Sequence, residues 1–258
     1  MFNSTLSPVL LSLGQLEIRY YGLFYVIGII LAYYLILYLA KKKLIKINKD
    51  QTENLLVYAG VGGIIGGRLF YVLVYNLQYY LQNPFEILAV WHGGLSVHGG
   101  LIGGIIGIYL FCKKYKFKFL EILDLIAIPF TLAHALGRIG NFINGELYGR
   151  ITDVSWCVNF PSVEGCRHPS QIYFAIANMV NFSILWVLKD KKLKKGSLFS
   201  IFLILNSIFR FNLEFLREPD PQLGFITLGL SMGQIISVIM LIIGVVLYLR
   251  INKKSMVT

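Results

Sequence analysis

Seven apolar segments, each about 18 residues or longer, are the feature that most restricts how this chain can fold. A transmembrane helix needs about 20 mainly apolar residues to cross a hydrocarbon core about 30 Å thick, so each segment is long enough. Strict alternation of apolar and polar residues, which a membrane β-barrel requires, is absent. The sequence therefore predicts an all-α polytopic membrane protein with about seven transmembrane helices. The predicted helices lie near residues 20–40, 55–75, 95–112, 120–140, 170–188, 198–216 and 226–249.

The composition agrees with this class, because 56% of the 258 residues are hydrophobic and only 14% are charged. No long linker or low-complexity segment interrupts the pattern, so we expect a single membrane domain over residues 1–258 with an outside loop at about 143–169. Residues 1–18 contain no lysine or arginine and so lack the basic start of a cleaved signal peptide. We expect the first helix to remain in the mature protein.

The net charge of +11 is concentrated at alternate ends of the apolar segments. By the positive-inside rule these basic ends face the cytoplasm, which places the N-terminus outside and the C-terminus in the cytoplasm. The clusters then act as topology signals beside anionic lipid, and we expect no nucleic-acid partner. They lie at residues 41–49, 113–118, 189–195 and 250–254.

Ionisable residues inside the apolar segments mark a candidate site. With this topology, His98 lies near the outer start of the third segment, and Arg138 and Arg210 lie near the outer ends of the fourth and sixth. Arg68 is just past the middle of the second segment, and Glu214 is one turn beyond Arg210. Charged groups in hydrocarbon are costly, and guanidinium groups suit phosphate recognition. The pattern predicts a site for a phospholipid headgroup in the outer leaflet.

Each of these residues also has a structural interpretation that the sequence leaves open. Arg210 and Glu214 can form an ion pair within one helix, and Arg68 can extend to the membrane surface. His98 can donate a hydrogen bond to a carbonyl group in a glycine-rich turn. Three arginines at a similar depth nevertheless exceed what helix anchoring needs, which favours the functional interpretation.

Glycines four residues apart occur in the second and third apolar segments. Gly62 and Gly66 form one such series, and Gly99, Gly103 and Gly107 form another. Because this spacing lets two membrane helices approach closely, we expect the two segments to pack tightly.

The three cysteines do not follow a zinc-ligand spacing, so no metal site and no cofactor are expected. Cys112 lies at a cytoplasmic end, whereas Cys157 and Cys166 share the outside loop. In an oxidising exterior these two can form a disulfide or remain free thiols, and their spacing does not decide between the two states.

The run from Gly137 to Arg150, GRIGNFINGELYGR, places one arginine, two asparagines and a glutamate at the end of the fourth apolar segment. This run resembles the signature of the bacterial prolipoprotein diacylglyceryl transferases. The seven-span architecture of that family, with its N-terminus outside, agrees with the topology predicted above. Further blocks resemble the family in the same order over nearly the whole chain: Tyr21-Gly22, Gly66-Gly67-Arg68, residues 93–100, residues 167–171, Arg210 with residues 214–217, and residues 231–234.

The resemblance implies transfer of the diacylglyceryl group from phosphatidylglycerol to the thiol of the lipobox cysteine of a prolipoprotein. A thioether forms and glycerol phosphate leaves, which is the first step of bacterial lipoprotein maturation. The implied partners are phosphatidylglycerol, the lipobox peptide and the lipid bilayer, without a cofactor. The implied location is the bacterial cytoplasmic (inner) membrane, with the active site toward the outer leaflet.

The resemblance also implies residue roles. Arg138 is expected to hold the headgroup, Arg210 to stabilise the departing phosphate, and His98 to act as the base for the thiol. Imidazole is a suitable acceptor because it titrates near neutrality, close to the pKa of a thiol. The other residues assigned to substrate binding are Tyr21, Asn141, Asn144, Glu146, Gly149, Arg68 and Glu214.

Two positions depart from the family pattern. Phe174 follows Tyr173 where the family usually has an acidic residue, so any role of that carboxylate is absent or supplied elsewhere, for example by Glu214 or Glu146. His92 stands where the family commonly has an acidic or polar residue.

The alternative function is a membrane transporter or flippase for an anionic lipid headgroup. Such a protein is expected to show paired interrupted helices in corresponding halves, and no such duplication is visible. An acyltransferase of another type is disfavoured because none of the four histidines begins an HxxxxD pattern.

Overall fold

The computed structural model describes residues 2–3, 7–13, 16–42, 45–219, 224–227 and 229–253. The protein is mostly helical, and five of the described helical segments are long and apolar enough to cross a membrane. They are Tyr20–Lys42 (α1), Lys49–Tyr75 (α2, Lys49–Phe70, continued by the π-helical turn η1, Tyr71–Tyr75), Phe119–Asn144 (α5), Ser170–Leu188 (α6) and Met232–Lys253 (α8).

Two further helices occupy the remaining predicted segments. Val97–Tyr115 (α4) lies in the predicted third segment, and Ser197–Leu213 (α7) lies in the sixth. The seventh segment was predicted to begin at residue 226, but α8 begins at Met232. A short antiparallel hairpin of Phe225–Thr227 (β6) and Leu230–Ser231 (β7) precedes it. The all-α class holds, whereas seven crossings and the direction of each terminus stay predictions.

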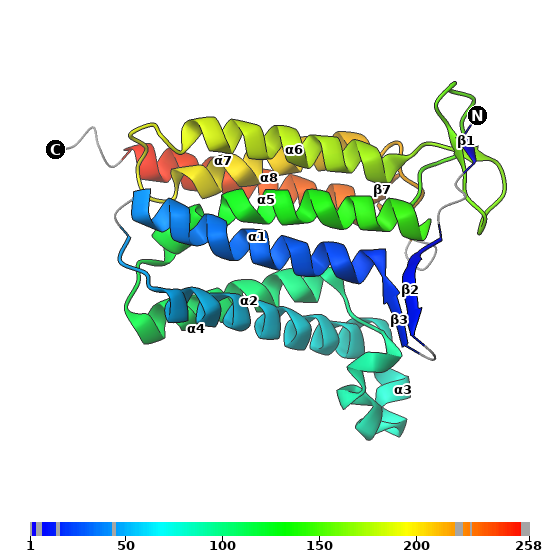
Figure 1. Ribbon diagram of the computed structural model, residues 1–258, viewed down its shortest axis with the longest axis horizontal. Coiled ribbons are helices and arrows are strands. Elements are labelled where there is room, and N and C mark those ends of the chain that lie inside the picture. The colour runs from blue at the N-terminus through cyan, green and yellow to red at the C-terminus, as the bar shows by residue number, and fades with distance from the viewer. Residues whose placement is uncertain are drawn as a thin grey trace. The chain divides into compact units, whose positions relative to one another are not determined.

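The chain divides into two compact units, and the single membrane domain expected above stays a prediction. The first unit contains residues 1–35 and 123–258, and the second contains residues 36–122. In the first unit α7 packs against both α6 and α8 (Figure 1). The first unit also contains two small sheets. Val9–Leu13 (β2) pairs with Leu16–Arg19 (β3) in one of them. In the other, Val158–Asn159 (β4) lies between Phe2–Asn3 (β1) and Cys166–Arg167 (β5) and pairs with both.

The N-terminus of α7 is held by a carboxylate from another helix. The side chain of Asp124 on α5 accepts hydrogen bonds from the backbone N–H groups of Gly196 and Phe199, at 2.6 and 2.7 Å. These N–H groups lack intrahelical partners, and a negative charge at a helix N-terminus is favourable. The contact joins the start of α7 to α5 within the buried part of the unit.

In the second unit α2 packs against α4 through the predicted glycines. A Cβ atom on Gly66 would lie 2.7 Å from the Cα atom of Gly103, and one on Gly62 would lie 3.2 Å from the Cα atom of Gly107. Only glycine allows the two backbones to approach this closely. The prediction of tight packing between these segments is confirmed.

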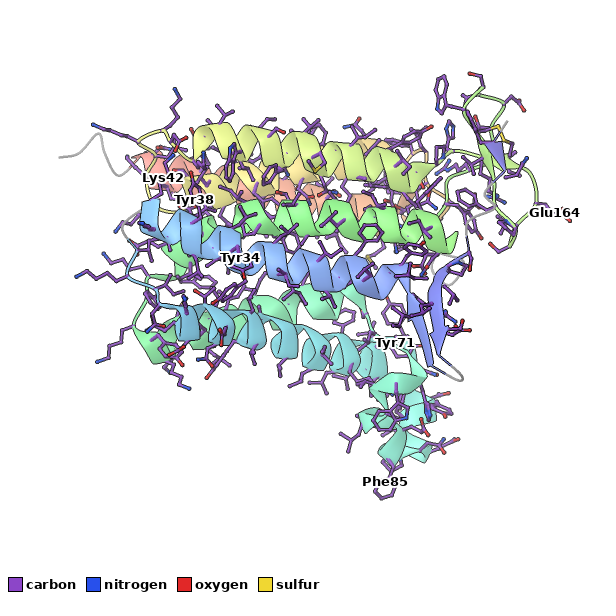
Figure 2. The ribbon with its side chains drawn as sticks, in the orientation of Figure 1. Tyr34, Tyr38, Lys42, Tyr71, Phe85 and Glu164 are labelled. Carbon is purple, nitrogen blue, oxygen red and sulfur yellow. A yellow bond between two sulfur atoms is a disulfide. The ribbon has the colours of Figure 1, made fainter. Side chains whose placement is uncertain are left out.

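The second unit also carries a short helical excursion between α2 and α4. It contains Leu77–Gln82 (α3) and the 3-10 turns Pro84–Leu88 (η2) and Val90–His92 (η3). Phe85 lies at its tip and is 90% exposed (Figure 2).

Candidate active site

The signature run forms the last turns of α5 and the bend that follows. Gly145 and Leu147 both have left-handed backbone conformations, with φ of +67° and +57°, so the chain turns away from the helix directly after Asn144. The bend brings the carboxylate of Glu146 back to the helix end. Its Oε1 accepts hydrogen bonds from the side-chain amides of Asn141, at 2.9 Å, and Asn144, at 3.3 Å. The three predicted polar residues therefore form one cluster.

The start of α6 holds this bend in place. Gln171, which is fully buried, donates from Nε2 to the carbonyl oxygen of Glu146 at 2.8 Å. The hydroxyl group of Ser170 donates to the carbonyl oxygen of Leu147 at 2.9 Å. Neither residue was assigned a role from the sequence, although both belong to a block that resembles the family. They position the backbone that carries Glu146.

Gly149 is held between two backbone segments. Its N–H donates to the carbonyl oxygen of His168 at 2.9 Å. A Cβ atom at this position would lie 2.5 Å from that oxygen and 2.6 Å from the carbonyl oxygen of Leu216. These contacts explain glycine here by packing, and the predicted role of Gly149 in substrate binding stays a prediction.

Arg138 is buried on α5, about one helical turn before Asn141. Its guanidinium carbon lies 4.9 Å from the centroid of the Phe174 ring, and its Nε is buried without a hydrogen-bond partner among the described residues. Arg138 also interacts electrostatically with Arg210 and Arg217, which repel it, and with Glu214, which attracts it. Of these three charged groups two are positive and one is negative, a balance that favours binding of an anion.

Glu214 forms a buried ion pair with Arg217. Arg217 Nη1 donates to Glu214 Oε1 at 2.9 Å, and both side chains are buried. The hydroxyl group of Ser231 donates to the same oxygen at 3.2 Å. A Cβ atom on Gly233 would lie 2.6 Å from it, so the backbone of α8 packs directly against the carboxylate. Arg217 and Ser231 are site residues to which the sequence analysis gave no role; the spacing of Arg217 three residues after Glu214 was the available signal.

Tyr21 reaches this region from the start of α1. A Cβ atom on Gly140 would lie 3.1 Å from Cδ2 of Tyr21, so the ring packs against α5 at this glycine. Gly140 lies between Arg138 and Asn141 in the sequence. Its hydroxyl group donates to the hydroxyl oxygen of Tyr25 at 3.2 Å. The first unit therefore brings together seven predicted site residues: Tyr21, Arg138, Asn141, Asn144, Glu146, Arg210 and Glu214.

Arg68 lies in the second unit and binds backbone instead of presenting free donors. It is 4% exposed, and its guanidinium group lies 5.1 Å from the centroid of the Tyr80 ring. A guanidinium group has five N–H donors, and the five recorded bonds to carbonyl groups use this capacity. These contacts hold the excursion that precedes α4, and the predicted role of Arg68 in headgroup binding stays a prediction. The five acceptors are the carbonyl oxygens of Glu86, Ile87, Ala89, Gly93 and Gly94.

The backbone of His98 lies in the first turn of α4, as predicted. Ser96 is the N-cap of this helix, and its N–H donates to the carbonyl oxygen of Gly67 at 3.0 Å, next to Arg68 in the chain. The side chain of His98 lies outside the described part of the structure. Its role as a base stays a prediction.

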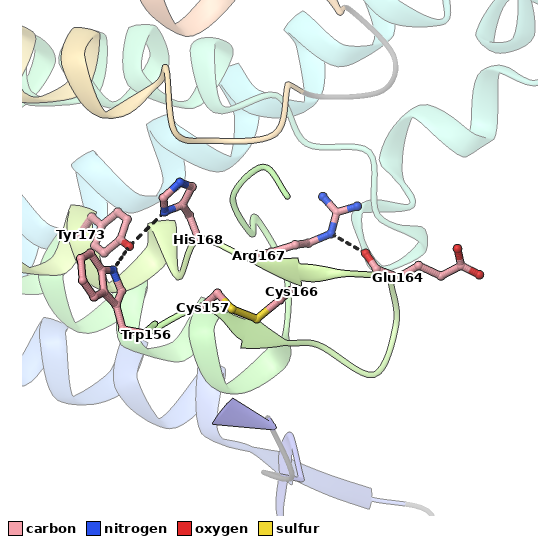
Figure 3. The surroundings of a disulfide bond; sticks show 7 residues. All are labelled: Trp156, Cys157, Glu164, Cys166, Arg167, His168 and Tyr173. Atoms are coloured by element: carbon pink, nitrogen blue, oxygen red, sulfur yellow. Dashed lines mark hydrogen bonds between the residues drawn. A yellow bond between two sulfur atoms is a disulfide. The ribbon is translucent and has the colours of Figure 1, made fainter. Parts of the chain in front are cut away.

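The loop after α5 contains a disulfide, which decides the question that the cysteine spacing left open. Cys157 and Cys166 are bridged, with their Cα atoms 5.4 Å apart (Figure 3). Beside the bridge, Trp156 Nε1 donates to the hydroxyl oxygen of Tyr173 at 2.7 Å, and Nδ1 of His168 lies 3.2 Å from the same oxygen. Burial lowers the pKa of His168, which favours a neutral ring. Its Nδ1 can then accept a hydrogen bond from the hydroxyl group of Tyr173. The chain of contacts ties the loop to α6.

Replacing Cys157 and Cys166 together by alanine is expected to speed proteolysis of this loop about tenfold or more. The bridge closes a loop of about ten residues, which in the chain-entropy model stabilises by about 2–3 kcal/mol. Limited proteolysis of the folded protein in detergent measures the effect. Cys112→Ala is the control because this cysteine is outside the loop. Equal cleavage rates for the double variant and the wild type would show that the bridge does not stabilise the loop.

Comparison with known proteins identifies the family. The profile of the prolipoprotein diacylglyceryl transferases matches residues 8–250. The phosphatidylglycerol–prolipoprotein diacylglyceryl transferase of Rickettsia rickettsii (strain Sheila Smith) is 48% identical over 254 residues, which cover 96% of this chain and 98% of the relative. The protein of that name in Legionella pneumophila (strain Lens) is 42% identical over 246 residues, or 94% of this chain and 96% of the relative. The chain belongs to this family.

Membership in the prolipoprotein diacylglyceryl transferase family confirms the resemblance found in the signature run. It also confirms the class of protein, a transferase of lipoprotein biosynthesis with apolar helices suited to a membrane. The roles of individual residues do not follow from the match and are argued below from their contacts.

Proposed function

We propose that this protein transfers the diacylglyceryl group of phosphatidylglycerol to the thiol of a prolipoprotein lipobox cysteine. The family match and the names of its relatives support the reaction. The observation in the structure that carries it is the buried Arg138. Its guanidinium group has an unpartnered Nε and lies in an apolar unit, where it interacts with two positive groups and one negative group. A phosphodiester is the anion that a membrane supplies in quantity, and a guanidinium fork matches its oxygens.

The chemistry is a displacement at the glycerol carbon that bears the phosphate. The thiol sulfur forms a bond to this carbon while the bond from the carbon to the phosphate oxygen breaks. The electron pair stays on the oxygen, so glycerol phosphate leaves with increased negative charge. Arg138 binds the phosphate in the ground state, and Arg210 stabilises the charge as it grows. The thiol proton passes to His98, because the thiolate is the effective nucleophile.

The polar cluster at the end of α5 has a supporting part in this proposal. Asn141 and Asn144 are bound to Glu146, and Glu146 is held through Gln171, so the cluster is rigid. It fixes the helix end next to Arg138 and offers the remaining carboxylate oxygen to the headgroup hydroxyls.

The direct test is incubation of the purified protein with phosphatidylglycerol and a lipobox peptide. We expect a thioether-linked diacylglyceryl peptide and glycerol phosphate in equal amounts. A peptide with serine in place of the lipobox cysteine is the control, because its hydroxyl group is a much weaker nucleophile. Movement of a headgroup-labelled lipid across vesicles without any product would instead support the transporter.

We also propose that the protein crosses the bacterial inner membrane seven times, with its active site toward the outer leaflet. The lysine clusters support this direction through the positive-inside rule. A reporter enzyme that is active only outside the membrane is expected to work when fused near Asn83 or Ser162. It is expected to fail near Lys116 or Lys194, and the reverse pattern would overturn the topology.

A further inference from the structure

A polar cavity lies among α5, α6 and α7 in the first unit, and apart from Arg210 none of its lining residues has been given a role in the reaction described above. Its space for a guest is about 10 Å³, which is roughly that of one water molecule or one oxygen atom. Asn206 and Arg210 at its edge are half-buried, so the cavity opens to the surface of the unit. The lining residues are His134, Phe174, Ala177, Asn178, Asn181, Asn206, Phe209 and Arg210.

Asn181 is the unexplained group in this cavity. It is 1% exposed, and neither its side-chain nitrogen nor its side-chain oxygen has a hydrogen-bond partner in the part of the chain that the structure describes. Burial of an amide without partners costs several kcal/mol relative to water, so a buried amide in a native protein nearly always has a hydrogen-bond partner, and one without a protein partner is a candidate to bind another molecule. The sequence analysis did not single out this residue, because an asparagine in an apolar segment shows no pattern on its own.

Two other polar lining residues, His134 and Asn178, already have hydrogen-bond partners. Asn178 donates from Nδ2 to the carbonyl oxygen of Phe174 at 2.7 Å, so its Oδ1 is the acceptor for Nδ1 of His134, at 3.1 Å. Both ends of the Asn178 amide therefore have a partner, and one of these partners is His134. Among the lining residues that the structure describes, Asn181 is the one with a buried side-chain amide that has no hydrogen-bond partner, so it can donate to a guest.

The cavity has a fixed relation to the two arginines. His134 precedes Arg138 by four residues on α5, and Asn206 precedes Arg210 by four residues on α7. Four residues of helix rise about 6 Å, so the cavity begins beside Arg210, which lines it, and extends one turn back along both helices. In a glycerophospholipid the two ester groups are attached to the other two glycerol carbons, of which one is next to the carbon that bears the phosphate. They therefore lie on this side of the phosphate.

We propose that the Asn181 cavity binds an ester carbonyl group of the lipid substrate. The Asn181 amide donates a hydrogen bond to the carbonyl oxygen, which is of the size that the cavity admits. The subsite makes the enzyme prefer diacyl over dialkyl ether lipids, since an ether lacks the accepting carbonyl. This inference rests on the proposed function, because it takes the phosphate to lie at Arg138 and Arg210.

The test compares dioleoyl phosphatidylglycerol with its dialkyl ether analogue. Their affinities for the purified protein are measured by competition with a fluorescent phosphatidylglycerol, and product formation is followed separately. For the wild type we expect the ether lipid to bind about three- to tenfold more weakly, the effect of losing one hydrogen bond. For Asn181→Leu we expect the diacyl lipid to weaken by the same factor, so that the two lipids bind equally.

The control is Asn212→Leu, the same substitution at an exposed asparagine whose amide donates to its own helix. It is expected to keep the wild-type preference. Asn181→Leu should fold, because replacing an unpaired buried amide by an apolar group of similar size is close to neutral; Asn181→Ala is the second variant. Equal binding of the two lipids by the wild type, or an unchanged preference in both Asn181 variants, would overturn the subsite. Absence of thioether product would overturn the proposed function and leaves the binding comparison valid.

Discussion

Replacing Arg138 by lysine is expected to lower kcat/KM by about 10²- to 10³-fold, the range seen when one preorganised donor to a developing anion is lost. Lysine retains the positive charge but lacks the planar fork, so it cannot present two parallel N–H groups to a phosphate. It also loses the stacked contact between the guanidinium group and Phe174. Initial rates with the lipobox peptide at several lipid concentrations separate KM from kcat. If Arg138 mainly binds the ground state, the loss appears in KM.

The matched control is Arg19→Lys. Arg19 lies in the hairpin of β2 and β3 and is exposed, with Glu17 as its partner at 2.9 Å. We expect full activity for this variant. Arg138→Lys is expected to insert and fold normally, because the buried charge is preserved, and thermal unfolding in detergent checks this. Wild-type kcat/KM in a folded Arg138→Ala would remove Arg138 from the site.

The long features of the fold could be predicted because they follow from one-dimensional patterns. Apolar length predicted every long helix, since a helix satisfies its own backbone groups. Glycine spacing predicted the packing of α2 on α4, because residues without a Cβ atom on one helix face let two helix backbones approach closely. The start of α8 was predicted too early, since Phe225–Thr227 is apolar enough to continue a helix pattern but pairs instead with Leu230–Ser231.

Partners of buried charges could not be predicted in the same way. Arg68 and Arg138 look alike in the sequence, because each is an arginine in an apolar segment. Their difference arises from chain folding: the excursion after α2 brings five carbonyl groups to Arg68, whereas Arg138 meets an aromatic face. Phe174 was noticed as a departure from the family pattern, but only the structure shows that it lies over Arg138. The disulfide was undecided because Cys spacing does not report the distance between Cα atoms.

The other large expected effect concerns His98. His98→Ala is expected to lower turnover by about 10²- to 10⁴-fold at neutral pH, the usual contribution of a general base, with little change in phosphatidylglycerol affinity. His92→Ala is the matched control. His92 is an exposed histidine whose ring nitrogen lies 2.8 Å from the carboxylate of Glu86, and it is expected to be dispensable.

The pH dependence separates a base from a positioning residue. A free thiol has a pKa of about 8.5, so the fraction of thiolate in the peptide rises through this range without help from the enzyme. A variant that lacks only its base should therefore recover as the pH rises, and the deficit of His98→Ala should shrink from pH 6 to about 9. A positioning role predicts a deficit that does not change with pH, and it predicts that His98→Gln keeps substantial activity through a retained hydrogen bond. Initial rates of the wild type and both variants at saturating lipid decide between the two roles. Near-wild-type turnover of both variants at neutral pH would exclude His98 as the base, and Glu146, the carboxylate held at the end of α5, would be the next residue to test.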